Sequence, residues 1–117
     1  MKLPADVFIA PEKLTQYLLV PLERNDKSGF LRIGGYTLDN ADLLLQHLQE
    51  HAQNMEAVPL ENNIYGQLYE IRGRIVGPSG ASLNICTIWM TEHLLGRTKF
   101  ITLFPDKRER NDEIPPV

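Results

Sequence analysis

A four-residue turn in the middle of the chain constrains the fold more than any other feature. Residues Gln67 to Thr91 form two strand-like runs joined by Gly77-Pro78-Ser79-Gly80. Pro78 suits the second position of a type I turn because its ring fixes φ. Gly80 accepts the left-handed conformation of the bulge that follows such a turn. The motif therefore predicts an antiparallel hairpin with a bulged register.

The distribution of apolar side chains selects this register. With the bulge, one face of the hairpin is almost entirely apolar, with the pairs Ile75–Leu83, Gly73–Ile85, Ile71–Thr87 and Tyr69–Trp89. The other face is mostly polar, with the pairs Val76–Ser82, Arg74–Asn84, Arg72–Cys86 and Glu70–Ile88. A shift by one residue would place the large apolar side chains among the charges, so apolar burial disfavours it. Gly73 is expected to leave room for a large neighbour, either Trp89 or a helix residue.

Length and composition narrow the class of protein. A chain of 117 residues is long enough for one domain with its own core. The net charge of −3 argues against general nucleic-acid binding, although a local basic patch stays open. Because Cys86 is the only cysteine, no disulfide can form within the chain, and we expect a cytoplasmic location. We expect neither a signal peptide nor a membrane span, since no apolar run is long enough.

Two helices are expected before the hairpin. The first begins at Pro11, since proline suits the first helical position, and is ended by Pro21. The second follows Asp39, its expected N-cap, and fades near residues 53–54. Each helix has an apolar stripe, formed by Leu14, Tyr17 and Leu18 in the first and by Ala41, Leu44, Leu45, Leu48 and Ala52 in the second.

The remaining segments complete an α+β layer fold. Residues 22–29 are expected to form a polar loop, residues 30–33 a short strand or turn, residues 57–60 an edge strand and residues 99–104 a final strand. We therefore predict two N-terminal helices packed on one face of a three- to four-stranded antiparallel β-meander. This single domain covers residues 1–105, and residues 106–117 are expected to form a flexible charged tail.

The polar face of the hairpin carries the first candidate chemistry. Glu70, Arg72 and Arg74 follow one another at a spacing of two, so they share one strand face. A carboxylate that accepts a proton beside guanidinium groups that hold a phosphate could cleave a phosphodiester. An acid or another cation could come from the next loop, supplied by His93, Lys99 or Arg97. A solvated sheet face with paired charges is the structural alternative.

A histidine pair raises the question of a metal. His47 and His51 are four residues apart on the second helix, a spacing that can chelate a cation. The residues between them do not supply the glutamate of the zinc-protease helix motif. We therefore interpret the two histidines as a surface pair on the helix flank, and we predict no metal site and no cofactor.

Two further features are interpreted structurally. Cys86 lies beside Arg72 in the predicted register, and a guanidinium can lower a thiol pKa. No histidine is placed to act with this thiol, so we expect it to be inert and half-buried. Three aromatic residues could stack on nucleic-acid bases, namely Trp89, Tyr69 and Tyr65. We assign all three to the core instead, because the helices need large apolar side chains on the sheet to pack against.

A scattered pattern extends from about Leu3 to Pro105 and consists of Lys13-Leu14, Tyr17-Leu18-Leu19, Lys27, Phe30, Gly35-Tyr36, Tyr65-Gly66, Tyr69, Gly73, Gly77-Pro78-Ser79-Gly80, Thr87-Ile88-Trp89, Ile101-Thr102 and Pro105. It resembles a bacterial domain of unknown function that is frequent in cyanobacteria. The layout of that family is similar to the barnase, EndoU, colicin and RelE group of RNase toxins. The resemblance implies no established activity. It implies an active site, if there is one, on the sheet face opposite the helices, and a partner encoded by a neighbouring small gene.

The family-like positions overlap only in part with the polar hairpin face. They are Lys27, Thr87, Trp89 and Thr102. Of these, Lys27 could bind phosphate from the loop after the first helix. Thr87 falls on the helix-facing side of the predicted sheet, where its hydroxyl is expected to bond locally.

Two functions therefore remain open. The first is a non-catalytic module that binds a small partner protein, or a second copy of the chain, through an edge strand such as residues 57–60 or 99–104. The second is a metal-independent RNase-like toxin that acts on RNA. In that case phosphate is bound by Lys27, Arg72 and Arg74, with Glu70 as base and His93 as acid. Convergence of Lys27, Glu70, Arg72 and His93 in one cleft would favour the enzyme.

Overall fold

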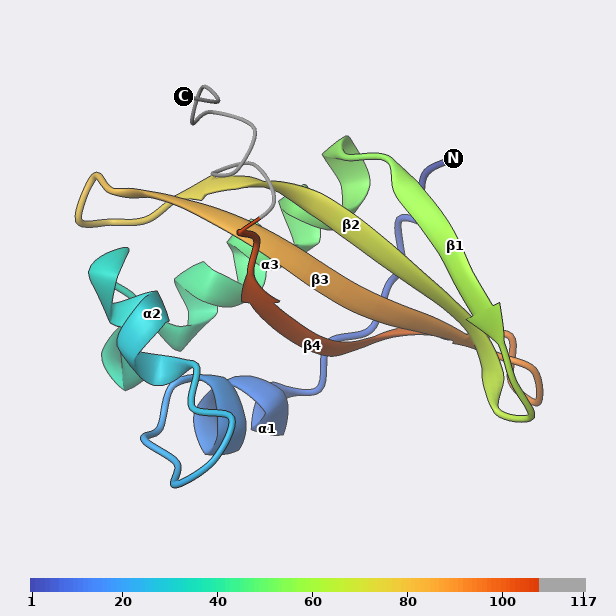
Figure 1. The fold of residues 1–117 in the computed structure, drawn as a ribbon, viewed down its shortest axis with the longest axis horizontal. Coiled ribbons are helices and arrows are strands. Elements are labelled where there is room, and N and C mark those ends of the chain that lie inside the picture. Colours follow the sequence, from blue (N-terminus) through green and yellow to red (C-terminus); the bar gives the residue numbers. More distant parts are fainter. Residues whose placement is uncertain (108–117) are drawn as a thin grey trace, which may run out of the picture.

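The sheet is a four-stranded antiparallel meander, described by a computed structural model over residues 1–107 (Figure 1). Its strands are β1 (Ala57–Asn62), β2 (Gly66–Val76), β3 (Ser82–Glu92) and β4 (Thr98–Pro105), and their order in space is their order in sequence. Among these four strands only sequence neighbours are paired, so each connection between them is a short turn.

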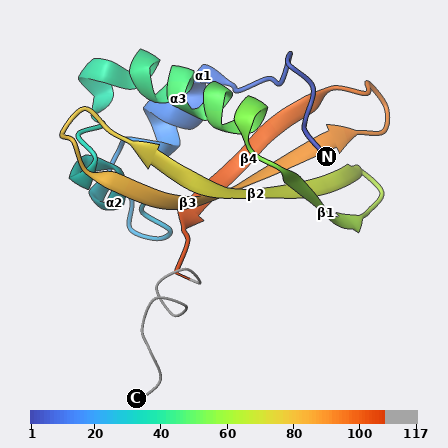
Figure 2. The same cartoon turned by 90° about the horizontal axis from the view of Figure 1, so that it is seen from above.

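The helices precede the sheet in the chain. A short α-helix, α1 (Pro11–Lys13), continues into the π-helical turn η1 (Leu14–Leu18). It is followed by α2 (Ser28–Ile33), the 3₁₀ turn η2 (Leu38–Asn40) and the long helix α3 (Ala41–Asn54). α1 and α3 lie on one side of the sheet, whereas α2 lies beside the turn between β2 and β3 (Figure 2). The α+β architecture with helices N-terminal to the strands is the one predicted.

The β2–β3 hairpin confirms the predicted register at all eight pairs, from Tyr69–Trp89 to Val76–Ser82. Gly80 has a φ of +89°, the left-handed conformation that the turn requires. The turn also packs on the end of α2, since the Ser79 N–H donates to the Gly34 carbonyl at 3.0 Å. A Cβ at Gly77 would collide with that same carbonyl oxygen, so only glycine fits there.

The core fills the space between α3, η1 and the inner face, by which we mean the sheet face that these helices cover. Trp89 is fully buried and stands edge-on to Phe100, with ring centroids 5.3 Å apart. Tyr69 is half-buried against this core, as expected. Tyr65 is 70% exposed, because it lies in the turn before β2, and its assignment to the core is wrong.

Residues 30–33 form most of α2, so the expected strand or turn is wrong. The preceding loop ends on Asp26, whose Oδ1 accepts bonds from the Ser28 N–H and hydroxyl and whose Oδ2 accepts from the Gly29 N–H. A carboxylate that satisfies the free donors of a first turn favours a helix over a strand. The predicted polar loop is therefore shorter and ends at Lys27.

The start of the long helix differs by two residues from the prediction. Thr37, and not Asp39, is the capping residue, because its Oγ1 accepts the Asp39 N–H while the Asn40 side chain accepts the Thr37 N–H. The capped residues first form η2 and then α3, which ends at Asn54 as expected.

Residues 1–107 contain no helix that combines the length and apolar character needed to cross a bilayer. The predicted tail, residues 106–117, falls outside the described part of the chain except for its first two residues. Of these, Asp106 is buried, and its N–H donates to the Asn84 carbonyl on β3 at 2.8 Å.

Candidate functional site

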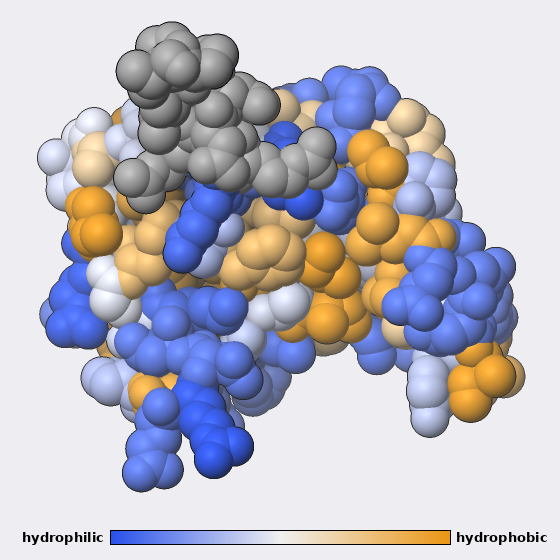
Figure 3. All heavy atoms as spheres, in the orientation of Figure 1, coloured by the Kyte–Doolittle hydropathy of each residue, from blue (hydrophilic) through white to orange (hydrophobic). Residues whose placement is uncertain are grey.

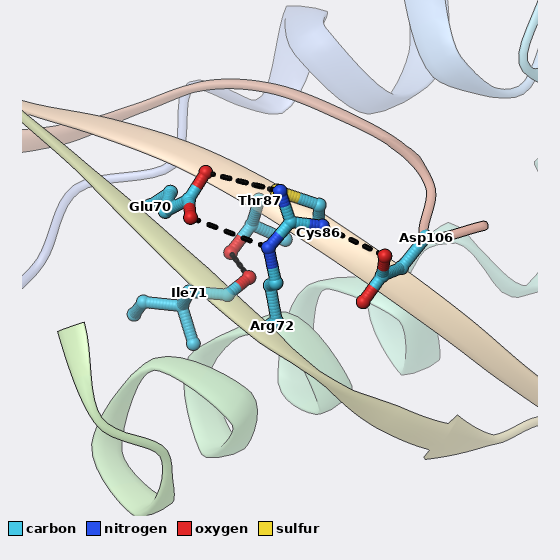
Figure 4. A network of polar contacts seen from close by, with 6 residues as sticks. All are labelled: Glu70, Ile71, Arg72, Cys86, Thr87 and Asp106. Atoms are coloured by element: carbon cyan, nitrogen blue, oxygen red, sulfur yellow. Dashed lines mark hydrogen bonds and ion pairs between the residues drawn. The ribbon is translucent and has the colours of Figure 1, made fainter. Parts of the chain in front are cut away.

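The outer face of the sheet, opposite α3, carries an ion-pair network centred on Arg72. Arg72 Nη1 lies 2.7 Å from Asp106 Oδ1, and Arg72 Nε lies 3.2 Å from Glu70 Oε1 (Figure 4). The Glu70 and Asp106 side chains are 17% and 7% exposed, so the network is shielded from water on one side. Both carboxylates therefore hold the guanidinium in place, and Asp106 ties the chain after β4 to the sheet.

Cys86 lies beneath this network and is fully buried. Its Sγ is 3.8 Å from Glu70 Oε2. Burial raises the pKa of the thiol to about 11 and outweighs Arg72, which alone would lower it. The raised pKa favours the protonated, unreactive thiol at neutral pH, but the expectation of a half-buried side chain is wrong, since Cys86 is fully buried.

Lys27 reaches the same outer face from the loop before α2. Its Nζ lies 5.8 Å from the centroid of the Phe104 ring. Phe104 is paired with Cys86, and Cys86 with Arg72, so these side chains form one row across β4, β3 and β2. At about 4.8 Å per strand, the Phe104 and Arg72 backbones are about 10 Å apart. Lys27, Glu70 and Arg72 thus share one face.

The other two predicted site residues lie elsewhere. His93 is in the turn after β3, where its ring Nε2 lies 2.8 Å from Asn62 Oδ1 and its backbone N–H donates to the Tyr65 carbonyl. Glu70 is paired with Ile88, five residues before His93 and about 16 Å away along the strand. Arg74 is exposed and lines a cavity between β2 and α3. The structure therefore does not bring all the predicted residues into one cleft.

The charges of the outer-face network balance one another. Lys27 and Arg72 contribute two positive charges, and Glu70 and Asp106 contribute two negative ones. Arg72 uses three of its five N–H donors on the two carboxylates, and these negative charges would repel a phosphate placed beside it. Within residues 1–107 the arrangement is therefore that of a structural clasp.

A second polar cluster, missed by the sequence analysis, lies in the core. Thr87 Oγ1 accepts the Trp89 Nε1–H at 2.8 Å, lies 2.9 Å from His51 Nε2 and lies 3.3 Å from the Ile71 carbonyl oxygen. If the hydroxyl donates to the Ile71 carbonyl, it can accept from both rings, so this network assigns the proton of His51 to Nε2. Thr87 therefore lies on the helix-facing side, as expected, but its hydroxyl bonds to His51 on α3 as well as to its strand neighbours, so the expectation of purely local bonding is wrong.

His51 is 3% exposed, so its interpretation as a surface residue is wrong. The ring fits because the neighbouring strand residue is Gly73: a Cβ there would lie 3.1 Å from His51 Cε1 and 3.2 Å from Met55 Cγ. The large neighbour expected over Gly73 is thus a helix residue. Burial lowers the pKa of His51 to about 4, and its Nδ1 has no hydrogen-bond partner within residues 1–107.

The first histidine of the pair is engaged differently. His47 Nδ1 lies 2.6 Å from the hydroxyl of Tyr36, whose pKa is raised by burial to about 12. The neutral hydroxyl and the imidazole nitrogen share one hydrogen bond, whose direction depends on the tautomer of His47. In the part of the chain that the structure describes, no group of three or more His, Cys, Asp or Glu side chains is placed to hold a metal ion.

A large apolar surface lies at the end of the sheet opposite the β2–β3 turn. We call it the distal surface and define it by Ile64, Tyr65, Met90, Leu94, Leu95 and Ile101. Ile64 is 85% exposed and Leu94 is 93% exposed. Most of these residues line a cavity of about 800 Å³, together with Glu92, His93 and Lys99. In Figure 3, apolar side chains gather on the outer face and at this end of the sheet.

The two turns that carry the distal surface are joined to each other. His93 connects them, because its N–H donates to the Tyr65 carbonyl and its ring lies 2.9 Å from the Asn63 carbonyl oxygen. Arg97 and Lys99 pair with Glu92 at 3.4 and 3.3 Å across the second turn. The exposed apolar side chains are therefore carried by two turns that hydrogen bonds and ion pairs hold in place.

Each predicted edge strand is partly covered by the N-terminal segment. The β4 edge is covered by Phe8, whose N–H donates to the Thr98 carbonyl and whose carbonyl accepts the Phe100 N–H, both at 2.8 Å. The Ile101 carbonyl accepts from Lys13 Nζ. On β1, the Ala57 N–H donates to the Met1 carbonyl, and Pro59 has no N–H to offer.

The chain belongs to the family described as a domain of unknown function, DUF6883, whose model matches residues 2–107. No curated protein matches the sequence. The fold is similar to that of a chain in the contact-dependent growth inhibition toxin–immunity protein complex from Klebsiella pneumoniae 342. That similarity has a TM-score of 0.65 and 18% sequence identity, and it covers 87% of this chain and 95% of the other.

Proposed function

We propose that this DUF6883 chain is a non-catalytic protein-interaction module, and that it binds a small partner protein through the distal surface. One observation carries the proposal: large apolar side chains, up to 93% exposed, stand together on two braced turns. Exposed apolar groups that are gathered in this way mark binding sites, because their burial against a partner is favourable. The fold of a toxin–immunity complex chain supports a partner of this kind.

The proposal places the protein in the cytoplasm, as one component of a pair encoded by adjacent genes. The distal cavity is lined by apolar side chains with charged residues at its margin, the composition expected of a protein interface. A partner that inserts an apolar anchor between Tyr65 and Leu94 would bury both side chains. We expect these two residues to contribute most of the binding energy.

Co-expression with the product of the adjacent gene tests this proposal. The wild-type chain should form a complex whose mass, measured by light scattering after size exclusion, equals the sum of the two chains. Leu94→Asp should abolish the complex, whereas Ile33→Asp should not. Ile33 is 62% exposed in α2 and is a matched apolar control outside the distal surface. A complex that survives Leu94→Asp and Ile64→Asp would refute the proposed surface.

A second candidate function is favoured by the row of Lys27, Phe104 and Arg72 on the outer face. In this alternative the protein is a metal-independent RNase-like toxin, with Glu70 as the base and Arg72 and Lys27 on the phosphate. The acid role of His93 and the phosphate role of Arg74 would then require RNA to span the whole face.

Induced expression in a bacterial host separates the two functions. Growth arrest with fragmented RNA, relieved by Lys27→Ala or Arg72→Ala, would establish the nuclease. Arg24→Ala is the control, because Arg24 is exposed and lies in the same loop region. Intact RNA and normal growth from soluble protein are the results that the interaction module predicts.

A further inference from the structure

β2 has a stretch of edge that β1 does not cover. β1 is paired with β2 only as far as Ala57, which lies opposite Ile71. β2 continues to Val76, so residues 73–76 extend past the end of β1 and are paired only with β3. We call this stretch the open edge.

The backbone of the open edge points away from the sheet at alternate residues. The Ala57 N–H donates to Met1 and not to β2, so Ala57 and Ile71 form a non-hydrogen-bonded pair. The N–H and C=O groups of Ile71 therefore face β3. Because the direction of these groups alternates along a strand, those of Arg74 and Val76 face away from β3, towards the open side. No hydrogen bond from elsewhere in residues 1–107 reaches these groups on that side.

A cavity of about 230 Å³ lies directly beside the open edge, between β2 and α3. Met55, Ile75 and Val76 form its apolar walls, and His47, Glu50, His51, Asn54 and Arg74 complete the lining. Successive side chains of an added strand alternate between the two faces of the sheet. One side chain of such a strand would therefore enter the cavity, while the next would lie over the outer face beside Arg74.

The charge at this edge indicates what could occupy it. Arg74 is exposed and makes no ion pair within residues 1–107, unlike Arg72, which contacts two carboxylates. A second copy of the chain is disfavoured, because two-fold pairing of the open edges would put the Arg74 side chains opposite or diagonal to each other. An acidic side chain on the added strand would instead be attracted.

We propose that the open edge binds an extended segment of a partner protein, with an apolar side chain of that segment in the cavity and a carboxylate beside Arg74. The segment adds to the sheet in line with β1, and backbone hydrogen bonds to Arg74 and Val76 hold it. This site is separate from the distal surface, so it stands even if no partner binds there.

The probe is the peptide acetyl-Thr-Val-Glu-Val-Thr-amide, titrated into the ¹⁵N-labelled full chain. The amide signals of residues 73–76 and of the cavity lining should shift. A matched peptide with Lys in place of Glu should bind about two- to fivefold more weakly, as expected for a like-charge cross-strand pair. Arg74→Glu should reverse this preference, whereas Arg24→Glu, at another exposed arginine, should preserve it.

Two further measurements complete the test. Val76→Pro removes one outward N–H, and the folded variant should lose the peptide-induced shifts. If that variant does not fold, the reversed peptide preference of the Arg74→Glu variant still tests the proposal. Shifts confined to other residues, equal binding of both peptides to the wild type, or a dimer in sedimentation that is broken by Val76→Pro would overturn the proposal.

Discussion

Acid should destabilise this protein through His51. The ring is buried against Gly73 with an unpartnered Nδ1, and burial lowers its pKa from 6.5 to about 4. Between these pH values the unfolded chain binds a proton that the folded chain does not. Stability is therefore fully present above pH 6.5 and falls as the pH decreases towards 4.

The magnitude follows from the size of the shift. A difference of about 2.5 pH units, at 1.36 kcal/mol per unit, corresponds to about 3 kcal/mol of lost stability at pH 4. Between pH 6.5 and pH 5 the loss should be about 2 kcal/mol. This interval lies above the range in which exposed carboxylates titrate, so His51 should dominate it.

Urea unfolding at pH 7.5, 6.5, 5.8 and 5.0 measures this effect, with His51→Gln as the reference. Glutamine has no charge to gain and keeps a donor for Thr87 Oγ1. The variant should be less stable than the wild type at pH 7.5 and should show a smaller loss towards pH 5. Parallel stability curves for the two proteins would refute the assignment of acid sensitivity to His51.

Three further predictions concern the core and the thiol. Gly73→Ala should lower the free energy of unfolding in urea by about 1–3 kcal/mol, because its Cβ would press on His51 and Met55. The control Gly29→Ala should not destabilise the protein, since its Cβ meets only Asp26 at 3.8 Å, and equal effects of the two substitutions would contradict this packing. Thr87→Val should lower the free energy of unfolding by about 2–4 kcal/mol, since the Trp89 and His51 donors lose their acceptor. A decrease below about 1 kcal/mol would show that these hydrogen bonds are absent. Cys86 should react with Ellman's reagent at pH 8 only after unfolding, and rapid reaction of the folded chain would contradict its burial.

The hairpin was predictable because its turn and its apolar pattern agree. Pro78 and Gly80 define the turn, and alternation of apolar side chains then leaves one register that buries them together. Both signals are local, so no knowledge of the rest of the chain is required. The α+β class follows, since an apolar sheet face needs helices to cover it.

The helix starts were less predictable because capping residues compete locally. Asp39, Asn40 and Thr37 can all cap a helix, and the structure uses Thr37 with Asn40. α2 depends on Asp26, whose carboxylate reaches forward to Ser28 and Gly29. Propensity alone does not select among such alternatives.

The sites were only partly predictable because they depend on contacts distant in sequence. The polar pattern identified the Glu70–Arg72 pair, but Asp106 completes the network from 34 residues further along the chain. The distal surface requires two turns to meet, and the open edge depends on where β1 ends. The pair of histidines gave the only signal for His51, and helical spacing alone did not show that the ring faces Gly73.

Hydrogen–deuterium exchange of the full chain, with and without the product of the adjacent gene, tests the central proposal most directly. The interaction module predicts slower exchange at residues 64–65 and 94–95, because a partner on the distal surface excludes water from both turns. The same residues should be unaffected in the Leu94→Asp variant. Protection confined to the outer face around Lys27 and Arg72, with exchange at both turns unchanged, would contradict the proposed function.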